Sequence, residues 1–342
     1  MIKTIFLIFL TSLGLTEALR HYALKQGVID TPNNRSSHTT PTPRGGGLSF
    51  VIIFLAAFSF AYFFNISDFT PQPGPFWAIF CCGLLVAGIG FWDDHTHIRV
   101  RWRLLAHSIA ALTGLFLLGL PEIPLPGLTT DLGLLGYPLG IIALAWLLNL
   151  FNFMDGIDGI AGTEALSVGI GAILIMQFAS AGDNAAPIFW LSILMAGVAG
   201  FLTWNWPPAK IFMGDAGSGF LGLMLGLFAI WSSNLGTSIW SWIILLALFI
   251  TDTTITLLHR MLSGERWFEA HCSHLYQQLS RKWGNHHSVT IALLSINMIW
   301  LFPWAWLAAV KPAAGLFAAL AAYFPLVLLA IKLGAGKSGL QK

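Results

Sequence analysis

Charged residues are scarce in this sequence. Only 9% of its 342 residues are Asp, Glu, Lys or Arg, whereas a soluble globular domain carries roughly 25%. With 56% hydrophobic residues, the chain cannot cover a water-facing surface, and a soluble globular protein is excluded. The formal net charge is only +2 and no long basic run occurs, which excludes a nucleic-acid partner.

Cysteine is also rare. Cys81 and Cys82 lie in an apolar run, and Cys272 lies in a polar stretch. Three cysteines placed in this way give no readable disulfide framework. The fold is therefore not expected to depend on an oxidising compartment.

Long apolar runs dominate what is present. About eleven runs reach or approach the roughly 17 residues that a bilayer requires, at 4–24, 46–64, 76–92, 104–120, 136–153, 159–180, 186–204, 216–233, 238–258, 288–308 and 313–331. The first run could also be a cleaved signal peptide, but no small-x-small cleavage site follows, so we expect a retained helix.

The apolar runs predict an all-α, polytopic integral membrane protein with about eleven transmembrane helices. The polar stretches at 25–45 and 259–287 are too short to be independent domains. No internal repeat of fixed period is visible. Residues 1–342 are therefore expected to form a single membrane-embedded domain.

The distribution of lysine and arginine predicts the orientation. If the N-terminus is periplasmic and the C-terminus cytoplasmic, fifteen of the 17 Lys and Arg residues lie at or beyond the inner interface, and only Lys3 and Lys311 lie outside. This split follows the positive-inside rule. All ten histidines fall on the same inner half, so the chemistry is expected to face the cytoplasm.

Five carboxylates are expected at that inner face: Asp93, Asp94, Asp155, Asp158 and Asp215. Acids at membrane depth are costly and by default mark function. A cluster of five would repel itself without a cation, and oxygen ligands with substrate phosphates suit magnesium. The structural alternative is that each acid caps a helix N-terminus.

Basic groups are expected beside the acids. Arg44 follows two prolines and precedes three glycines, and Arg99, Arg101 and Arg103 follow Asp94. Such side chains can neutralise phosphates. The alternative for Arg101 and Arg103 is that they only satisfy the positive-inside rule.

The last inner loop adds three polar groups, His271, Cys272 and His274. The histidines are candidates for phosphate binding, and the three residues together could instead form an irregular zinc site. Asp252 lies about two turns before His259 and Arg260, so we expect it to be their structural ion-pair partner.

The segments PTPRGGG, GFWDD, NLFNFMDGIDG, MGDAGSG and AHCSHLYQ together resemble the polyprenyl-phosphate N-acetylhexosamine-1-phosphate transferase superfamily. The resemblance covers about residues 30–287 and is strongest for the O-antigen-initiating branch of WbpL-type transferases. Cys272 departs from the arginine expected between the two histidines. This departure puts the loop's phosphate binding in doubt without affecting the acidic core.

The resemblance implies a UDP-N-acetylsugar donor, undecaprenyl phosphate as acceptor and Mg²⁺ as cofactor, with Mn²⁺ as an alternative ion. It also implies a location in the bacterial inner membrane with a cytoplasmic active site, and it leaves a homodimer open. By analogy, Asp93 and Asp94 are the catalytic candidates, and Asn152 and Asp215 are the metal ligands. The substrate-binding candidates are Arg44, Asn149, Asp155, Asp158, His271 and His274.

The expected reaction is attack by the lipid phosphate on the sugar-bearing phosphorus, with UMP leaving. Asp93 would be the general base or position the acceptor. Residues that read the sugar are expected in the stretch 259–287. Two alternatives are a phospho-MurNAc-pentapeptide transferase of the same superfamily and, in another class, an ion-coupled transporter, whose site would lie nearer the bilayer midplane.

Overall fold

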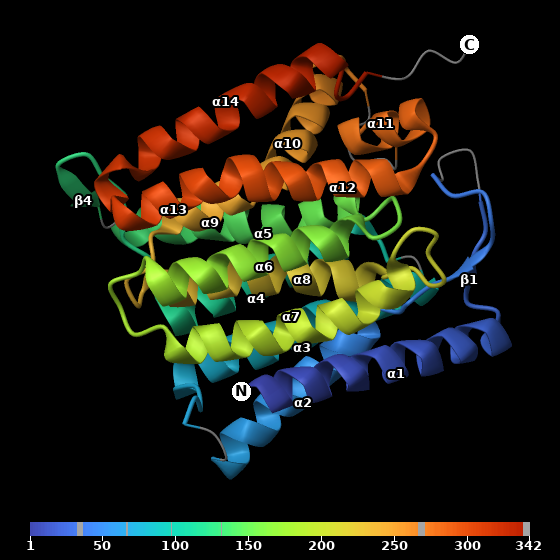
Figure 1. The fold of residues 1–342 in the computed structure, drawn as a ribbon, viewed down its shortest axis with the longest axis horizontal. Coiled ribbons are helices and arrows are strands. Elements are labelled where there is room, and N and C mark those ends of the chain that lie inside the picture. Colours follow the sequence, from blue (N-terminus) through green and yellow to red (C-terminus); the bar gives the residue numbers. More distant parts are fainter. Residues whose placement is uncertain (33–36, 66–67, 97, 131, 266–270, 338–342) are drawn as a thin grey trace.

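The computed structural model is a bundle of long helices that lie side by side along the longest axis of the molecule (Figure 1). It describes residues 1–32, 37–65, 68–96, 98–130, 132–265 and 271–337. The helices are α1 (Ile2–Gln26), α2 (Leu48–Phe64), α3 (Pro73–Thr96), α4 (Val100–Leu118), α5 (Gly136–Met154), α6 (Ile160–Phe178), α7 (Ala185–Asn205), α8 (Asp215–Ser233), α9 (Ile239–Leu245), α10 (Ala247–Leu262), α11 (Leu275–Trp283), α12 (His286–Ile296), α13 (Phe302–Val310) and α14 (Gly315–Leu333).

Each of the eleven predicted segments is helical. Among the described residues, eight helical segments are long and apolar enough to cross a membrane, and the bent pair α9 and α10 would make a ninth. Helix α2 is apolar but has only 17 residues, and α4 begins with charged residues. The prediction of an all-α polytopic membrane protein is confirmed at this level.

Two of the predicted continuous spans are interrupted. The segment predicted at 238–258 divides into α9 and α10, which meet at Leu246 with a bend of 65°. The segment predicted at 288–308 contains a π-helical stretch, η2 (Asn297–Leu301), between α12 and α13. Such breaks cannot be predicted from the apolar pattern of the sequence, because apolar residues continue on both sides of each break.

Small irregular elements connect the helices. Strands β1 (Ile29–Asp30) and β2 (Thr42–Pro43) form one antiparallel pair, and β3 (Ile123–Leu125) and β4 (Leu128–Thr130) form another. Two short 3₁₀ turns, η1 (Gly133–Leu135) and η3 (Pro312–Ala314), precede α5 and α14. These short pairs were not predicted and leave the fold essentially helical.

Helix α8 forms the centre of the bundle. Every residue from Ala216 to Ser232 is buried, and α8 packs against α3 and α5, while α1 lies along α7. Glycines allow the backbones to approach closely. A Cβ added to Gly90 of α3 would lie 2.6 Å from the backbone nitrogen of Ala216, and one added to Gly222 would lie 2.7 Å from the carbonyl oxygen of Leu147. This packing brings the end of α3 against the start of α8.

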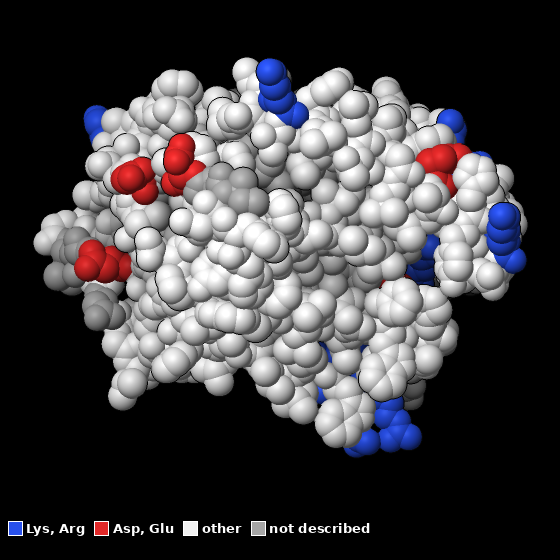
Figure 2. Space-filling view, turned by 90° about the horizontal axis from the view of Figure 1, so that it is seen from below, with Lys and Arg blue, Asp and Glu red and all other residues white. Residues whose placement is uncertain are grey.

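The surface agrees with a membrane location. In the view of Figure 2 the broad face in the middle of the molecule is almost free of charged side chains, which lie toward its ends and along its edges. Helix α1 begins and α14 ends at opposite ends of the bundle (Figure 1). This arrangement suits termini on opposite faces of a bilayer, while the side that faces the cytoplasm stays a prediction.

Candidate functional site

The three acidic segments meet at one end of the bundle. Asp93 and Asp94 occupy the last turns of α3, Asp155 follows the end of α5, and Asp215 is the first residue of α8. Arg44 Nη2 lies 2.8 Å from Asp94 Oδ1 and 2.5 Å from Asp215 Oδ1. The predicted gathering of acids with Arg44 is confirmed.

Asp94 also anchors the start of α8. Its two carboxylate oxygens accept the backbone N–H groups of Asp215, at 3.1 Å, and Ala216, at 3.4 Å. These are N–H groups that a helix start leaves without intrahelical partners. For Asp94 the capping alternative is therefore correct, although its cap serves a helix far along the chain.

Arg103 belongs to the site as well. Its Nη1 lies 2.5 Å from Asp93 Oδ2 and 3.5 Å from Asp215 Oδ2. Asp93 also accepts the backbone N–H of Ile98 at 2.6 Å. The positive-inside rule alone does not explain Arg103, because its guanidinium points inward to two carboxylates, whereas Arg101 is exposed and lies over Trp102.

The glycine-rich loop at residues 45–47 lies along the segment that leads into α8. Gly46 and Gly47 donate backbone hydrogen bonds to the carbonyls of Phe212 and Met213, both at 2.9 Å. A Cβ on Gly47 would lie 2.7 Å from Gly217 Cα, so only glycine fits. Burial alone would lower the pKa of Arg44, but Asp215 and Asp94 outweigh burial and raise it above its usual value. The guanidinium stays charged.

A polar cavity of about 230 Å³ opens beside this loop. Five of the predicted site residues line it: Arg44, Asn152, Asp155, Asp158 and Asp215. The sequence did not single out the other polar side chains of its wall. These are Asp30, Ser37, His38, Asn205, Gln277 and His286.

Asp155 is an acid of this wall whose pKa is raised. Burial raises its pKa well above the usual range, Arg44 lowers it in part, and Asp215, Asp94 and Asp158 raise it further. A carboxylate in this position favours a bound cation, because a cation would relieve the repulsion among these acids.

Asp158 lies on the side of the cavity formed by α12. Its Oδ1 lies 3.2 Å from His286 Nδ1, and its Oδ2 accepts the backbone N–H of Ala209 at 3.0 Å. His286 Nε2 lies 3.1 Å from the carbonyl oxygen of Ser37. The signal that could have found His286 is the prediction that all ten histidines lie on the inner half of the membrane protein.

The two asparagines of α5 have different surroundings. Asn152 Oδ1 accepts a hydrogen bond from the Ser218 hydroxyl, so its oxygen faces α8 beside Asp215. Asn149 Nδ2 donates to the carbonyl oxygen of Ala145 at 2.6 Å and lies 3.4 Å from His107 Nδ1. Asn152 lines the cavity, whereas Asn149 is deeper along the helix.

The two predicted histidines lie apart from the described cavity wall. His274 is buried, with its Nδ1 3.4 Å from Asp252 Oδ1, and its ring stacks on that of His271. The expected pairing of Asp252 with His259 and Arg260 is wrong. Arg260 binds Glu265 at 2.6 Å, because α10 turns its Asp252 face toward the start of α11.

No metal cluster of three or more His, Cys, Asp or Glu side chains occurs among the described residues, so the zinc alternative at His271, Cys272 and His274 has no support there. Magnesium asks for less from a protein, since one or two carboxylates with waters and substrate phosphates suffice. Asp215 and Asn152 both line the cavity and offer oxygen atoms of the type that magnesium prefers.

The chain is similar to known proteins over most of its length. Residues 76–233 match Glycosyl transferase family 4. A probable undecaprenyl-phosphate N-acetylglucosaminyl 1-phosphate transferase of Bacillus subtilis is 30% identical over 85% of this chain and 80% of its own length. An undecaprenyl-phosphate alpha-N-acetylglucosaminyl 1-phosphate transferase of Yersinia pestis is 29% identical over 80% and 75%.

A third relative has a different name. A phospho-N-acetylmuramoyl-pentapeptide-transferase of Heliobacterium modesticaldum is 31% identical over 60% of this chain and 65% of its own length. Residues 76–233, which match the family, contain the ends of α3 and α5 and all of α8, and these elements carry the acids of the site. The chain therefore belongs to glycosyl transferase family 4, within the polyprenyl-phosphate sugar-phosphate transferase superfamily that its motifs resemble.

Proposed function

We propose that this protein transfers an N-acetylsugar 1-phosphate from a UDP-sugar to undecaprenyl phosphate, releases UMP, and thereby starts a lipid-linked O-antigen or related envelope polysaccharide. The observation that carries the proposal is the polar cavity at one end of an apolar bundle, where Arg44 and Asp215 lie beside Asn152 and Asp155. The names of two relatives support the same acceptor and the transfer of an N-acetylsugar 1-phosphate.

The cavity is suited to the diphosphate of a nucleotide sugar. Arg44 can neutralise phosphate oxygens through its forked donors, and Asp215 with Asn152 would hold Mg²⁺, or Mn²⁺ in its place. When bound, that ion would neutralise charge on the diphosphate and on the departing UMP. The position of the acids at one end of the bundle, rather than at its middle, favours a transferase over an ion-coupled transporter.

The acceptor is expected on the side of Asp93 and Arg103. An oxygen of the lipid phosphate attacks the sugar-bearing phosphorus, one P–O bond forms, and the bond to the UMP oxygen breaks. The lipid phosphate is already largely ionised near neutral pH. Reducing the repulsion between this phosphate and the diphosphate of the donor therefore matters more than removing a proton. Arg103, held by Asp93 at 2.5 Å, is placed to reduce this repulsion, and Asp93 would position it or act as base.

The proposed site faces the cytoplasm of a bacterial inner membrane, where nucleotide sugars are made. The fifteen-to-two distribution of Lys and Arg supports this orientation. The phospho-MurNAc-pentapeptide transferase stays the second candidate because similar proteins carry that name.

The test is an assay of the purified protein in detergent with undecaprenyl phosphate, Mg²⁺ and a panel of UDP-sugars. We expect UMP release together with a lipid product whose mass equals the acceptor plus one sugar phosphate. Asp215→Asn is the matched control for background hydrolysis. Release of UDP, or absence of a lipid product with every donor, would overturn the proposal, and a product from UDP-MurNAc-pentapeptide alone would select the second candidate.

A further inference from the structure

Gln277 is a buried residue of the cavity wall that the mechanism above does not use. It is only 6% exposed, and it lines the cavity with Asp155, Asp158 and Asp215. Its Oε1 is buried and has no hydrogen-bond partner among the described residues. Buried polar atoms are nearly always paired, so an unpaired acceptor in the wall of a binding cavity points to a ligand that brings a donor.

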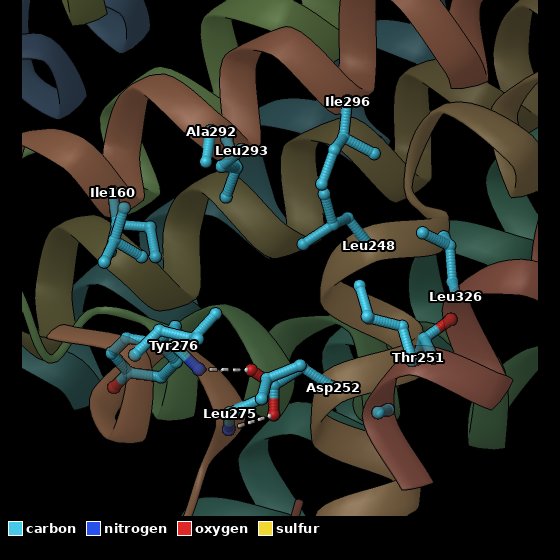
Figure 3. Close-up of a pocket in the computed structure, with 14 residues that line it drawn as sticks. Ile160, Leu248, Thr251, Asp252, Leu275, Tyr276, Ala292, Leu293, Ile296 and Leu326 are labelled. Atoms are coloured by element: carbon cyan, nitrogen blue, oxygen red, sulfur yellow. Dashed lines mark hydrogen bonds between the residues drawn. The ribbon is translucent and has the colours of Figure 1, made fainter. Parts of the chain in front are cut away.

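The surroundings of Gln277 hold it in place. Asp252 accepts the backbone N–H groups of Leu275 at 2.9 Å and Tyr276 at 3.0 Å, and thereby caps the first turn of α11. Figure 3 shows these two bonds below a small apolar pocket of about 80 Å³. A carboxylate at a helix N-terminus is a strong cap, so the direction of α11 is fixed from its first residue.

A second contact joins α11 to the acidic turn after α5. The Tyr276 hydroxyl donates to the carbonyl oxygen of Phe153 at 2.9 Å. A Cβ added to Gly156 would collide with that hydroxyl and would lie 3.2 Å from Gln277 Nε2. Gln277 therefore lies directly against the turn that carries Asp155, beside the residues that would bind the diphosphate.

The part of the donor that Gln277 meets follows from the chemistry of the cavity. The aromatic side of the wall is Phe212, whose ring packs edge-on with His38 at 4.8 Å, and such a ring suits a planar base. Gln277 belongs to a different segment, and its carbonyl oxygen Oε1 is an unpaired acceptor. Sugar hydroxyls and an acetamido N–H are donors that fit such an acceptor.

We infer that Gln277 is a specificity-determining residue that accepts a hydrogen bond from an O–H or N–H group of the donor sugar. This inference rests on the proposed function and adds the residue that reads the sugar. A site that pairs a buried acceptor with one donor group rejects analogues that lack the group, because the acceptor is then left unpaired.

The neighbouring residue provides a matched control. Gln278 has the same side chain, but its Nε2 donates to the carbonyls of Ser273 at 2.9 Å and Gly334 at 3.0 Å. Gln278 does not line the described cavity wall. Gln277→Met and Gln278→Met therefore make the same chemical change on two faces of α11.

The experiment is a double-mutant cycle between protein and donor. The donor that the parent uses best is compared with analogues in which one O–H group is replaced by hydrogen, or the acetamido group by hydroxyl. For one analogue we expect the parent to lose about tenfold in kcat/KM and Gln277→Met to show almost none of this penalty. Gln278→Met should keep the parent's penalty.

One further measurement separates the outcomes. Inhibition by UMP, which carries no sugar, should be unchanged in Gln277→Met. Because the penalty is a ratio within one variant, it is independent of how much protein folds. The inference would be overturned if Gln277→Met kept the parent's kcat/KM penalties for every analogue. It would also be overturned if the substitution weakened inhibition by UMP as much as it weakened use of the donor. A parent that releases UMP from no UDP-sugar would instead overturn the proposed function.

Discussion

Asp94 accepts hydrogen bonds from the first two backbone N–H groups of the helix that Asp215 begins, although 121 residues separate the two acids. The same carboxylate lies 2.8 Å from Arg44. Asp94 thus fixes the position of Asp215 and of the arginine that binds it. Of the two adjacent acids of α3, Asp94 has a structural task that the structure describes, and its catalytic role stays a prediction.

We expect Asp94→Ala to destabilise the protein by about 1 kcal/mol, as loss of a helix cap does. Asp94→Asn should lose less, because its amide oxygen can still accept one N–H bond. Thermal unfolding in detergent measures the difference. The control is Asp68→Ala, at an exposed carboxylate. Equal stability of Asp94→Ala and the parent would contradict the capping role.

Asp215→Asn and Asp93→Asn should distinguish a residue that binds the metal ion from one that acts on the acceptor. Asp215→Asn should lose most activity at every magnesium concentration that supports the parent, because a ligand to the phosphate-bound ion is removed. Asp93→Asn should turn over slowly yet bind the UDP-sugar as the parent does, because we propose that its partner Arg103 meets the acceptor phosphate. Calorimetric titration of donor and initial rates measure both effects, and near-parental turnover in either variant contradicts its role.

His271 should contribute to stability at neutral pH and lose that contribution in acid. Burial, followed by His274 and Arg260, lowers its pKa from 6.5 to about 3. Below about pH 6.5 the unfolded chain takes up a proton that the folded protein refuses, so unfolding becomes easier as the pH falls. This also argues against His271 as a cation that neutralises phosphate.

The measurement is the unfolding midpoint at pH about 7 and about 5. The fall between the two should be smaller in His271→Gln than in the parent. His21→Gln, which removes an exposed histidine, should behave like the parent. A steeper fall in His271→Gln would mean that the folded protein holds the histidine charged.

The orientation is open to direct test. A reporter fused after Lys342 should read cytoplasmic, and a cysteine at Glu122, exposed at the opposite end of the bundle, should react with a membrane-impermeant reagent from the periplasm. Cys81, Cys82 and Cys272 are replaced beforehand so that only the new thiol reports. Reversed readings would place the acidic end of the bundle on the wrong side for cytoplasmic nucleotide sugars.

The acidic end of the bundle was predictable because each of its acids borders an apolar run, and the runs indicate the depth of their ends in the membrane. The partners of those acids were not predictable in the same way. Arg103 lies ten residues after Asp93 across a helix break, and only the packing of α4 against α3 and α8 decides that it turns inward. Charge counting could therefore place Arg103 at the membrane interface but not in the site.

Asp252 gives the opposite lesson. Helical spacing predicted its partner on the same helix, but the carboxylate instead caps α11, twenty-three residues later. Helical spacing predicts only which residues are neighbours on the same helix. A buried carboxylate can instead accept hydrogen bonds from N–H groups of any element that the fold brings close and leaves unpaired. Gln277 escaped notice for the same reason, since nothing in its neighbourhood of sequence distinguishes it from Gln278.

The reaction should also run backwards. A diphosphate in the UDP-sugar is exchanged for a diphosphate in the lipid product, so the reaction free energy should be small, and UMP with the lipid product should regenerate the UDP-sugar. Attack at phosphorus leaves the bond between the sugar C1 and its oxygen intact, so the UDP-sugar and the lipid product must have the same anomeric configuration, unlike the reactant and product of a single inverting transfer at carbon. Purified protein with Mg²⁺, UMP and polyprenyl-diphosphate sugar tests this by mass and by NMR of the recovered nucleotide sugar, with Asp215→Asn as the inactive control. Attack by UMP at the sugar carbon would instead release polyprenyl diphosphate and leave a nucleotide sugar with a single phosphate. Recovery of that product would mean that the roles assigned to Arg44, Asp93 and Asp215 around a phosphorus centre are wrong.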